Sequence, residues 1–417
     1  MGKKSKILSS RLGGIVCLLC TVMLLNNSAY AMLNFSGRGE GLSRTYSVFA
    51  NGFDAVGWNP ANLILSPKFS FNILSIGMEY SSNLSVGDWI KLASHGYFND
   101  EDKKIFQNGL SFGACGGAQA ISFSWKNIAF TSCLVTKNAG EIPSDFTKMI
   151  FWGNMPETDS VYSFDGTQGV SEIALDIGVS AAQLIASDNF SIGATIKYLE
   201  GFSYMDAKLD GGLKTTFDDD PASSTIISGN GSAVLRYAEG GTGFGIDIGA
   251  LYFNEDYNMG ISVINILSGM EWLENPAIDS LTFTVKPTDL EHFDPNTSVK
   301  WDTTTITGRS FSTKEDMSVK LGCSINKKTM NVAAEIGYPQ WFGMGAEIPY
   351  KAVVFRTGVG LVKAISKSNL WIGIGIGTKF KLLHADLGVR VSPTTSMSAA
   401  LALTILPEEK IDKAFGQ

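Results

Sequence analysis

The chain lacks the long apolar runs of a helical membrane protein. A transmembrane helix needs about 20 consecutive, predominantly apolar residues, and no such run occurs after residue 31. Charged residues are also sparse, at 18%, and the net charge is −7. Nucleic-acid-binding proteins need a basic surface, which this acidic balance does not supply. The composition therefore argues against a helical membrane protein and against a nucleic-acid partner.

Residue types that commonly carry catalysis or bind metals are few. After residue 31 the chain has three widely spaced cysteines and three isolated histidines: Cys115, Cys133, Cys323, His95, His292 and His384. An odd set of cysteines without C-x-x-C spacing is neither a disulfide framework nor a metal site. No H-x-x-x-H pair and no G-x-x-x-x-G-K-[ST] loop is present. The sequence therefore predicts no enzyme, no metal and no cofactor.

The first 31 residues have the pattern of a secretion signal. A positively charged segment precedes the short apolar run at residues 15–25, and Ala29 and Ala31 occupy the −3 and −1 positions of an A-x-A cleavage site. We expect cleavage after Ala31, which makes residues 1–31 a signal peptide. The alternative is an uncleaved anchor helix, although the apolar run is shorter than a membrane span.

The rest of the chain is dominated by alternation with a period of two. In WIGIGIG the residues Ile372, Ile374 and Ile376 share one face of a strand and the glycines share the other. The same template predicts about fourteen strands, near 68–80, 112–126, 128–138, 170–183, 189–201, 242–253, 256–267, 316–326, 330–338, 342–349, 352–363, 370–380, 382–392 and 396–406. A tilted transmembrane strand needs about 9–11 residues, and these segments reach that length.

The connections between the predicted strands alternate between long and short through the first eight strands. Long connections are expected at 81–111, 139–169, 202–241 and 268–315, and the intervening ones are tight turns. Outer-membrane barrels have short periplasmic turns, longer extracellular loops and an even strand number. We therefore predict an all-β, transmembrane antiparallel barrel of about 14 strands with both termini on the periplasmic side.

If the Ile, Leu and Val face meets lipid, the opposite face lines the lumen. It carries both signs of charge: Glu172, Asp176, Lys197, Asp247, Lys320, Glu335, Glu347, Arg356, Lys379, Asp386 and Arg390. These side chains can fill the barrel as a lattice of salt bridges or, alternatively, form an ion path. Trp125, Trp341 and Trp371 fall near strand ends, which is typical of aromatic girdles.

Acidic residues gather in the two longest expected connections. They are FDDDP at 217–221 and the group Glu291, Asp294 and Asp302. Carboxylates there could bind a divalent cation, but their spacing does not match an EF-hand. A solvated loop surface is the simpler interpretation.

The segment NGFDAVGWNPANLIL at 51–65 contains the pattern G-x-N-P-A-x-L, formed by Gly57, Asn59, Pro60, Ala61 and Leu63. This pattern, between a signal peptide and about fourteen strands, resembles the FadL type of outer-membrane barrel and its PorV-like relatives. The resemblance implies a plug at 32–66 inside the lumen, a barrel at 67–406 and a periplasmic tail at 407–417. The alternative is that the segment is a structured lead-in to the first strand.

The resemblance also implies a function. A FadL-like monomer in the outer membrane of a Gram-negative envelope would admit fatty acids or small hydrophobic compounds passively, surrounded by membrane lipid. A PorV-like barrel would instead act in protein secretion or envelope organisation, with a protein partner and no transport. The last predicted strand ends at LALTILP and is followed by a charged tail, whereas barrels of this type usually end on an aromatic residue.

Overall fold

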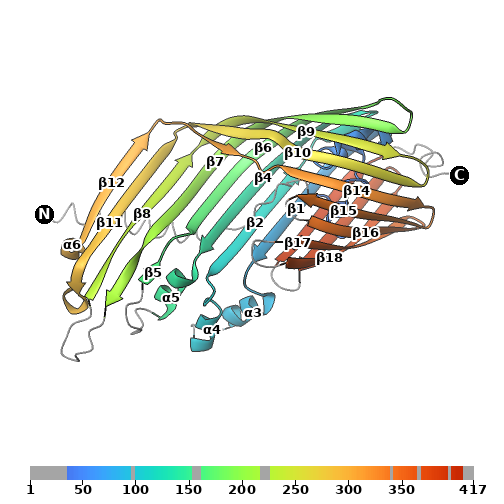
Figure 1. The fold of residues 1–417 in the computed structure, drawn as a ribbon. Helices are drawn as coiled ribbons and strands as arrows, with labels where there is room; N and C mark the ends of the chain where they lie inside the picture. Colours follow the sequence, from blue (N-terminus) through green and yellow to red (C-terminus); the bar gives the residue numbers. More distant parts are fainter. Residues whose placement is uncertain are drawn as a thin grey trace.

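The computed structural model describes residues 35–94, 99–152, 161–216, 226–338, 341–363, 368–392 and 396–406. They form a closed antiparallel β-barrel of 14 wall strands (Figure 1). The first strand, β1 (Phe69–Ser82), closes the barrel by pairing with the last, β20 (Ser396–Ile405). Closure leaves no sheet edge facing lipid within the ring, as backbone hydrogen bonding requires in a membrane. The prediction of an antiparallel barrel of about 14 strands is confirmed.

Between β1 and β20 the wall strands follow in chain order, some as two or three consecutive β segments. They are β2 (Leu110–Gln119) with β3 (Ser122–Trp125), β4 (Ile128–Ile142), β5 (Val161–Ser163) with β6 (Thr167–Leu184), β7 (Phe190–Thr216), β8 (Ile226–Ala238) with β9 (Gly240–Phe253), β10 (Tyr257–Glu274) with β11 (Ala277–Asp289), β12 (Val299–Thr307) with β13 (Phe311–Lys314) and β14 (Ser318–Lys327), β15 (Met330–Tyr338), β16 (Trp341–Tyr350), β17 (Val353–Lys363), β18 (Ser368–Phe380) and β19 (Leu383–Ser392).

Two of the expected long connections are largely strand, so the prediction of loops at 202–241 and 268–315 is wrong. In both regions the strands continue and pair with each other, β7 with β8, β8 with β11 and β11 with β12. Figure 1 shows these strands projecting far beyond the ends of β14 to β18. β12 was missed because it is exposed along both faces, so its sequence has no apolar face to reveal the period of two.

The remaining long connections lie at the same end of the barrel and contain short helices. They are α3 (Val86–Ser94), α4 (Asp100–Lys104), α5 (Ser144–Trp152), η3 (Leu290–His292) and α6 (Pro295–Ser298). Asn99 caps α4 through a capping box with Asp102. Among the described residues, no helix combines the length and the apolar character needed to cross a membrane.

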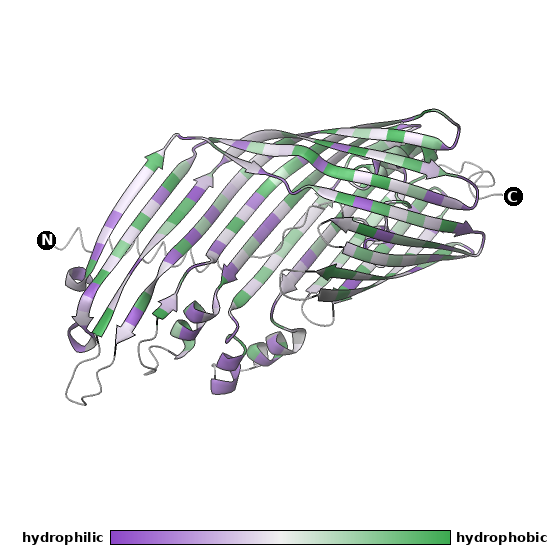
Figure 2. Ribbon diagram, viewed as in Figure 1, coloured by the Kyte–Doolittle hydropathy of each residue, from purple (hydrophilic) through white to green (hydrophobic). Residues whose placement is uncertain are grey.

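Alternating side chains give the barrel an apolar outer face, visible as alternating colours along the strands (Figure 2). Ile374 of β18 is 67% exposed, and its neighbours Ile372 and Ile376 on the same face of the strand are exposed too. Isolated exposed apolar residues are ordinary on soluble proteins, but a continuous belt of them marks a lipid-facing surface. The predicted orientation of this face toward lipid agrees with the fold.

The girdle prediction is correct for one tryptophan and wrong for two. Trp125 points outward and is 64% exposed. Trp371 is buried and stacks on the Arg390 guanidinium, whose Cζ lies 3.9 Å from the ring centroid. Trp341 packs against lumen-facing Gly360. The alternation of side chains along a strand determines which way each tryptophan faces, because a residue next to a lipid-facing one must point into the lumen. There, cations stack on the indole rings.

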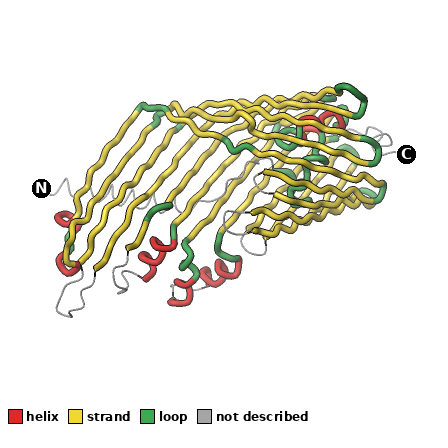
Figure 3. The backbone as a smooth tube through the Cα atoms, in the orientation of Figure 1, coloured by secondary structure: helices red, strands yellow, loops and turns green. Residues whose placement is uncertain are grey.

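The N-terminal part of the described chain lies inside the barrel, at the end with the short turns. It consists of α2 (Gly37–Gly41), η1 (Gly52–Ala55) and η2 (Pro60–Leu65), with irregular segments between them. Figure 3 shows these helices and loops enclosed by strands at the end opposite α3 to α5. We call residues 35–66 the plug. The expected signal peptide, 1–31, and the expected tail, 407–417, lie outside the described residues.

Candidate functional site

The plug rests directly on glycines of the barrel wall. A Cβ atom at Gly388 would lie 2.0 Å from the Gly37 carbonyl oxygen, and one at Gly358 would lie 2.3 Å from that of Leu42. No side chain fits at such distances, so only glycine allows the two backbones to approach this closely. The lumen face of β17 and β19 is therefore shaped to receive α2.

The same contact accounts for the WIGIGIG run of β18. Its isoleucines face outward, and a Cβ atom at Gly373 would lie 2.6 Å from the Glu40 carbonyl oxygen. One at Gly375 would lie 2.9 Å from the Gly41 Cα. Glycine thus alternates with isoleucine because one face of β18 meets lipid and the other meets the plug backbone.

The G-x-N-P-A-x-L pattern fastens the second half of the plug to the wall. Gly57 has φ +80°, a left-handed conformation that favours glycine. Asn59 caps η2 by accepting a 3.1 Å hydrogen bond from the Ala61 N–H, and its Nδ2 donates one of 3.3 Å to the Ala250 carbonyl in β9. Pro60 occupies the first position of η2, where its missing N–H costs nothing.

Ala61 and Leu63, the last two residues of the pattern, are buried. Leu63 belongs to an apolar cluster completed by Ala55, Val56, Ala129 and Ala182. The small side chains of this cluster bring η2 close to β4 and β6. The pattern therefore combines a turn, a cap, a wall contact and an apolar anchor within a few residues.

Three groups of buried ion pairs connect the plug to the wall. In the first, Arg38 of the plug donates two 2.7 Å hydrogen bonds to the Glu347 carboxylate. Arg356 donates a 2.8 Å bond to the same carboxylate and lies 2.6 Å from an Asp386 oxygen. Arginine suits this position because its planar group binds a carboxylate in a bidentate manner.

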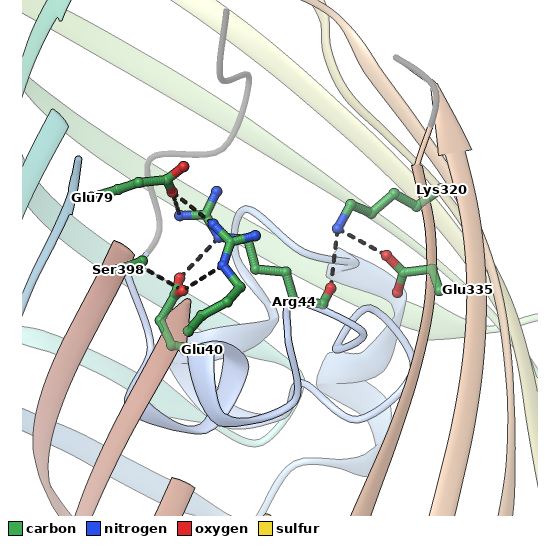
Figure 4. A network of polar contacts seen from close by, with 7 residues as sticks. Glu40, Arg44, Glu79, Lys320, Glu335 and Ser398 are labelled. Atoms are coloured by element: carbon green, nitrogen blue, oxygen red, sulfur yellow. Dashed lines mark hydrogen bonds and ion pairs between the residues drawn. The ribbon is translucent and has the colours of Figure 1, made fainter. Parts of the chain in front are cut away.

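The second group joins two plug residues to three wall residues (Figure 4). Arg44 lies 2.9 Å from Glu40 and 2.8 Å from Glu79 of β1. Arg390 of β19 contacts the same two carboxylates at 3.2 and 2.8 Å. Ser398 donates a 2.7 Å hydrogen bond to Glu40. Two guanidinium groups and two carboxylates thus balance each other in a site with almost no solvent exposure.

The third group is centred on Lys320 of β14, which lies 2.8 Å from Glu335 of β15. Lys320 also donates a 3.4 Å hydrogen bond to the Arg44 carbonyl and sits 4.6 Å above the ring of Trp58. The Ser47 N–H and hydroxyl both donate to Glu335, at 3.0 and 2.5 Å. Removing one partner of such a buried pair typically costs about 3–5 kcal/mol, so these contacts hold the plug firmly.

The structure divides the charged residues expected in the lumen into two sets. Six of them meet the plug: Lys320, Glu335, Glu347, Arg356, Asp386 and Arg390. Sequence reasoning did not name their partners Arg38, Glu40, Arg44 and Glu79. The first three could have been inferred, because they lie in the predicted plug, and charges within a segment enclosed by a barrel need counter-charges. Lys379 lies opposite His384 in the β18–β19 pair, outside both sets.

Of the other four, Glu172, Asp176 and Lys197 line a cavity on the inner side of the plug, and Asp247 is paired with Lys197. The cavity has a volume of ≈ 70 Å³, and the plug residues Val56 and Gly57 form part of its lining. We call it the polar chamber. Its wall residues come from β2, β4, β6, β7 and β10 and from the segment between β13 and β14.

Two lysines of the polar chamber are paired with carboxylates. Lys197 lies 2.8 Å from Asp247. A β-bulge between Val263 and Leu267 of β10 places Asn265 beside this pair, where its N–H donates a 2.8 Å hydrogen bond to Asp247 and its side chain accepts one from Lys197.

Lys137, which sequence reasoning did not name, provides the second pair. It lies 2.5 Å from Glu315 and 3.6 Å from Glu172. Lys137 is in β4, where the alternation of the sequence is weak, so its inward direction was not evident.

One wall of the polar chamber is apolar. Val135, Ala174, Leu199 and Met270 line it and also belong to a buried cluster with Tyr204 and Trp272. The rings of Tyr204 and Trp272 have centroids 5.0 Å apart, and that of Phe311 lies 5.4 Å from Tyr204. We call Leu199, Tyr204, Met270, Trp272 and Phe311 the aromatic cluster. The lumen therefore offers adjoining charged and apolar surfaces.

The carboxyl of Asp54 in the plug has a raised pKa. Burial raises the pKa of Asp54 to about 6, against opposing hydrogen bonds from Tyr46 and Ser36 of 3.0 and 3.2 Å. Burial disfavours the charged form of a carboxyl group, and Asp54 has no ion pair among the described residues to offset it.

The acidic residues expected in the loops form no metal-binding group in the part of the chain that the structure describes. FDDDP at 217–221 lies outside the described residues. Asp294 caps α6, whereas Asp302 is an exposed residue of β12. In the described part of the chain, no three His, Cys, Asp or Glu residues are placed to hold a metal ion.

Comparison with known proteins identifies the family of this chain. The model of a family of unknown function, DUF5723, matches residues 60–346. The chain belongs to this family. The DUF5723 match begins in η2 of the plug and ends within β16. No curated protein matches the chain.

Solved structures resemble this DUF5723 chain over nearly its whole length. The Ralstonia pickettii toluene transporter TbuX gives a TM-score of 0.50 at 15% identity, covering 90% of this chain and 98% of its own. The P. putida toluene transporter TodX gives 0.52 at 11% identity, covering 91% and 100%. The CymD monoaromatic hydrocarbon channel gives 0.50 at 12% identity, covering 90% and 98%. At such identities the likeness establishes the fold, a FadL-type barrel.

Proposed function

We propose that the chain is an outer-membrane channel through which small hydrophobic compounds enter passively. The observation that supports this proposal is the aromatic cluster inside the lumen. Buried aromatic side chains offer an apolar surface to a guest in a barrel interior that is rich in charge. Solved barrels with this fold are described as transporters of toluene or channels for monoaromatic hydrocarbons.

In this arrangement a compound would enter from the end with the long connections and reach the aromatic cluster before the plug. The plug closes the opposite end through its three groups of ion pairs. Passage would therefore require the plug to shift, whereas binding at the aromatic cluster would not. The protein works without nucleotide or metal in this proposal, as a monomer surrounded by membrane lipid.

The test is entry of radiolabelled toluene into Gram-negative cells that express the full chain. We expect faster entry than in cells with an empty vector, and slower entry for Trp272→Ala, which removes the largest ring of the aromatic cluster. Trp301→Ala is the matched control, because Trp301 lies in β12 and is exposed. Entry at the empty-vector rate in cells with correctly inserted protein would contradict the proposal.

The same cells test location and processing. We propose a signal peptide at 1–31, a plug at 32–66, a barrel at 67–406 and a periplasmic tail at 407–417. The mature protein should sediment with the outer membrane and begin at Met32 by N-terminal sequencing. An N-terminus at Met1 in the inner-membrane fraction would overturn this assignment.

A second candidate function is that of a PorV-like barrel that binds a protein in secretion or envelope organisation. The observation that favours it is β12, which pairs with β11 on one side and with no strand on its other side among the described residues. An open edge strand can pair with another chain. Native mass spectrometry in mild detergents separates the two: a stable protein partner without a bound hydrophobic compound would favour this second function.

A further inference from the structure

Three buried oxygen atoms of the polar chamber have no hydrogen-bond partner among the residues that the structure describes. They belong to Gln119, Asp176 and Ser268, all of which line the cavity. Gln119 is only 3% exposed. Leaving such a group unsatisfied costs about 1–3 kcal/mol, so an occupant of the chamber is expected to satisfy it.

Gln119 and Asp176 belong to one row across the sheet. Gln119 of β2 is opposite Cys133 of β4, and Cys133 is opposite Asp176 of β6. Directly opposed residues point to the same face, and neighbouring strands are ~4.8 Å apart. The two oxygen-bearing side chains therefore flank Cys133 from either side, about 10 Å apart at the backbone, and both face the cavity.

The charges around the chamber are not balanced. Lys137 and Lys197 are matched by Glu315 and Asp247 in close ion pairs. Glu172 lies 3.6 Å from the already paired Lys137. Asp176 has no ion-pair partner among the described residues. Carboxylates thus outnumber ammonium groups, and a positively charged occupant would be favoured over a neutral or negative one.

The chemistry of that occupant follows from the walls. The carboxylates are not placed to coordinate a metal ion in the described part of the chain. The free oxygens of Gln119 and Asp176 accept hydrogen bonds, which an ammonium group can donate three at a time. Beside them, Leu199 and Met270 of the aromatic cluster offer an apolar surface to the cavity.

We propose that the polar chamber binds the ammonium group of a small amphipathic amine, with the apolar part of the amine against Leu199 and Met270. This inference rests on the proposed function and narrows its substrate class. The volume of ≈ 70 Å³ also has room for a few waters, so occupation by water only is one outcome of the test.

The experiment uses the full chain in lipid nanodiscs at pH 7, with empty nanodiscs as the blank. Three probes of equal length are titrated and followed by ligand-observed NMR: butylamine, 1-butanol and butanoate. They carry positive, zero and negative charge on the same apolar chain. We expect butylamine to bind at least about tenfold more tightly than 1-butanol, equivalent to ~1.4 kcal/mol, and butanoate to bind most weakly. Equal affinities, or no binding by any probe, would overturn the inference in favour of water only.

Variants identify the site. Asp176→Asn keeps the shape of the side chain and removes its charge, so it should lower butylamine affinity about tenfold while leaving 1-butanol within about twofold. Asp302→Asn, on exposed β12, is the control and should change neither. Gln119→Leu provides a second variant in case Asp176→Asn fails to insert, and it should also weaken butylamine selectively. An unchanged preference for butylamine in both chamber variants would place its binding elsewhere and overturn the proposal.

The toluene assay keeps the two proposals distinct. If toluene enters cells through the channel but butylamine has no advantage over 1-butanol, the inference about amines fails and the proposed function stands. If butylamine binds as expected but toluene entry stays at the empty-vector rate, the proposal that the chamber binds amines is supported. The proposal of passive uptake of hydrophobic compounds is then wrong.

Discussion

The guanidinium group of Arg38 in the plug donates two hydrogen bonds of 2.7 Å to the Glu347 carboxylate in the wall. The two residues are 309 positions apart in the chain. Arg356 also donates to Glu347, so one carboxylate binds two guanidinium groups. Losing the charge of Glu347 should therefore loosen the contact of the plug with β16 and β17.

We predict that Glu347→Gln releases the α2 half of the plug. The change leaves the partly buried Arg38 without its ion-pair partner, and removing one partner of a fully buried pair costs about 3–5 kcal/mol. Single-channel recordings in planar bilayers should show larger conductance or more frequent opening than the wild type. Asp256→Asn is the control, because it breaks an exposed pair with Lys327, and exposed pairs contribute about 0–1 kcal/mol. Identical recordings for all three proteins would contradict the prediction.

The glycine contacts make an independent prediction about the same half of the plug. Gly388→Ala adds a Cβ atom 2.0 Å from the Gly37 carbonyl oxygen, so the plug backbone must move away from β19. We expect the plug to become accessible to added protease while the barrel still shows heat-modifiable migration on a gel. Gly87→Ala, where the nearest atom is 3.6 Å away, should leave the plug protected. Equal protection of both variants would show that the plug does not depend on this contact.

The wall strands could be predicted because a membrane barrel repeats one simple pattern. In β18 every second residue faces lipid, and the run of Ile372, Ile374 and Ile376 records this directly. The alternating pattern is lost in strands that extend beyond the lipid. β12 has solvent on both faces, so its residues are not constrained to alternate and it was mistaken for part of a loop.

The plug motif could be named from the sequence, but not the contacts that it makes. The turn at Gly57 and the cap at Asn59 are local, and local rules predict them. The contact of Asn59 with the Ala250 carbonyl depends on how the barrel closes around the plug. In the same way, strand parity indicated that Arg390 points inward, whereas only the closed barrel brings it to Glu40 and Glu79.

The raised pKa of Asp54 predicts that the stability of the plug depends on pH. Its pKa is raised from 3.8 to about 6, chiefly by burial, so the folded plug binds this proton more tightly than the unfolded chain does. The stabilising contribution is fully present below about pH 4, falls as the pH rises toward 6, and is absent above that value. Since a shift of one in pKa corresponds to 1.36 kcal/mol, the plug loses ~3 kcal/mol of stability over this pH range.

Asp54→Asn should remove this dependence, because an amide cannot ionise. Protease protection of the plug, measured between pH 4 and pH 8, should decline from pH 4 to about pH 6 in the wild type and then stay level, whereas in the variant it should stay nearly level throughout. Glu291→Gln, at an exposed loop position, should follow the wild type. A wild-type profile that rises toward pH 8 would contradict the assignment of Asp54 as the titrating group.

The lipid-facing assignment of β18 can be tested by placing a charge in the middle of the apolar belt. Ile374 is 67% exposed near the centre of the strand, so Ile374→Arg would place a guanidinium group among lipid tails. Arginine at the midplane of a membrane barrel costs about 2–4 kcal/mol and much less near the interfaces. Urea unfolding in lipid vesicles should show that loss for Ile374→Arg. Ala352→Arg lies in the exposed turn between β16 and β17, where water solvates the charge, and should unfold like the wild type. A similar stability of the two variants would mean that this face of β18 does not meet the hydrocarbon core.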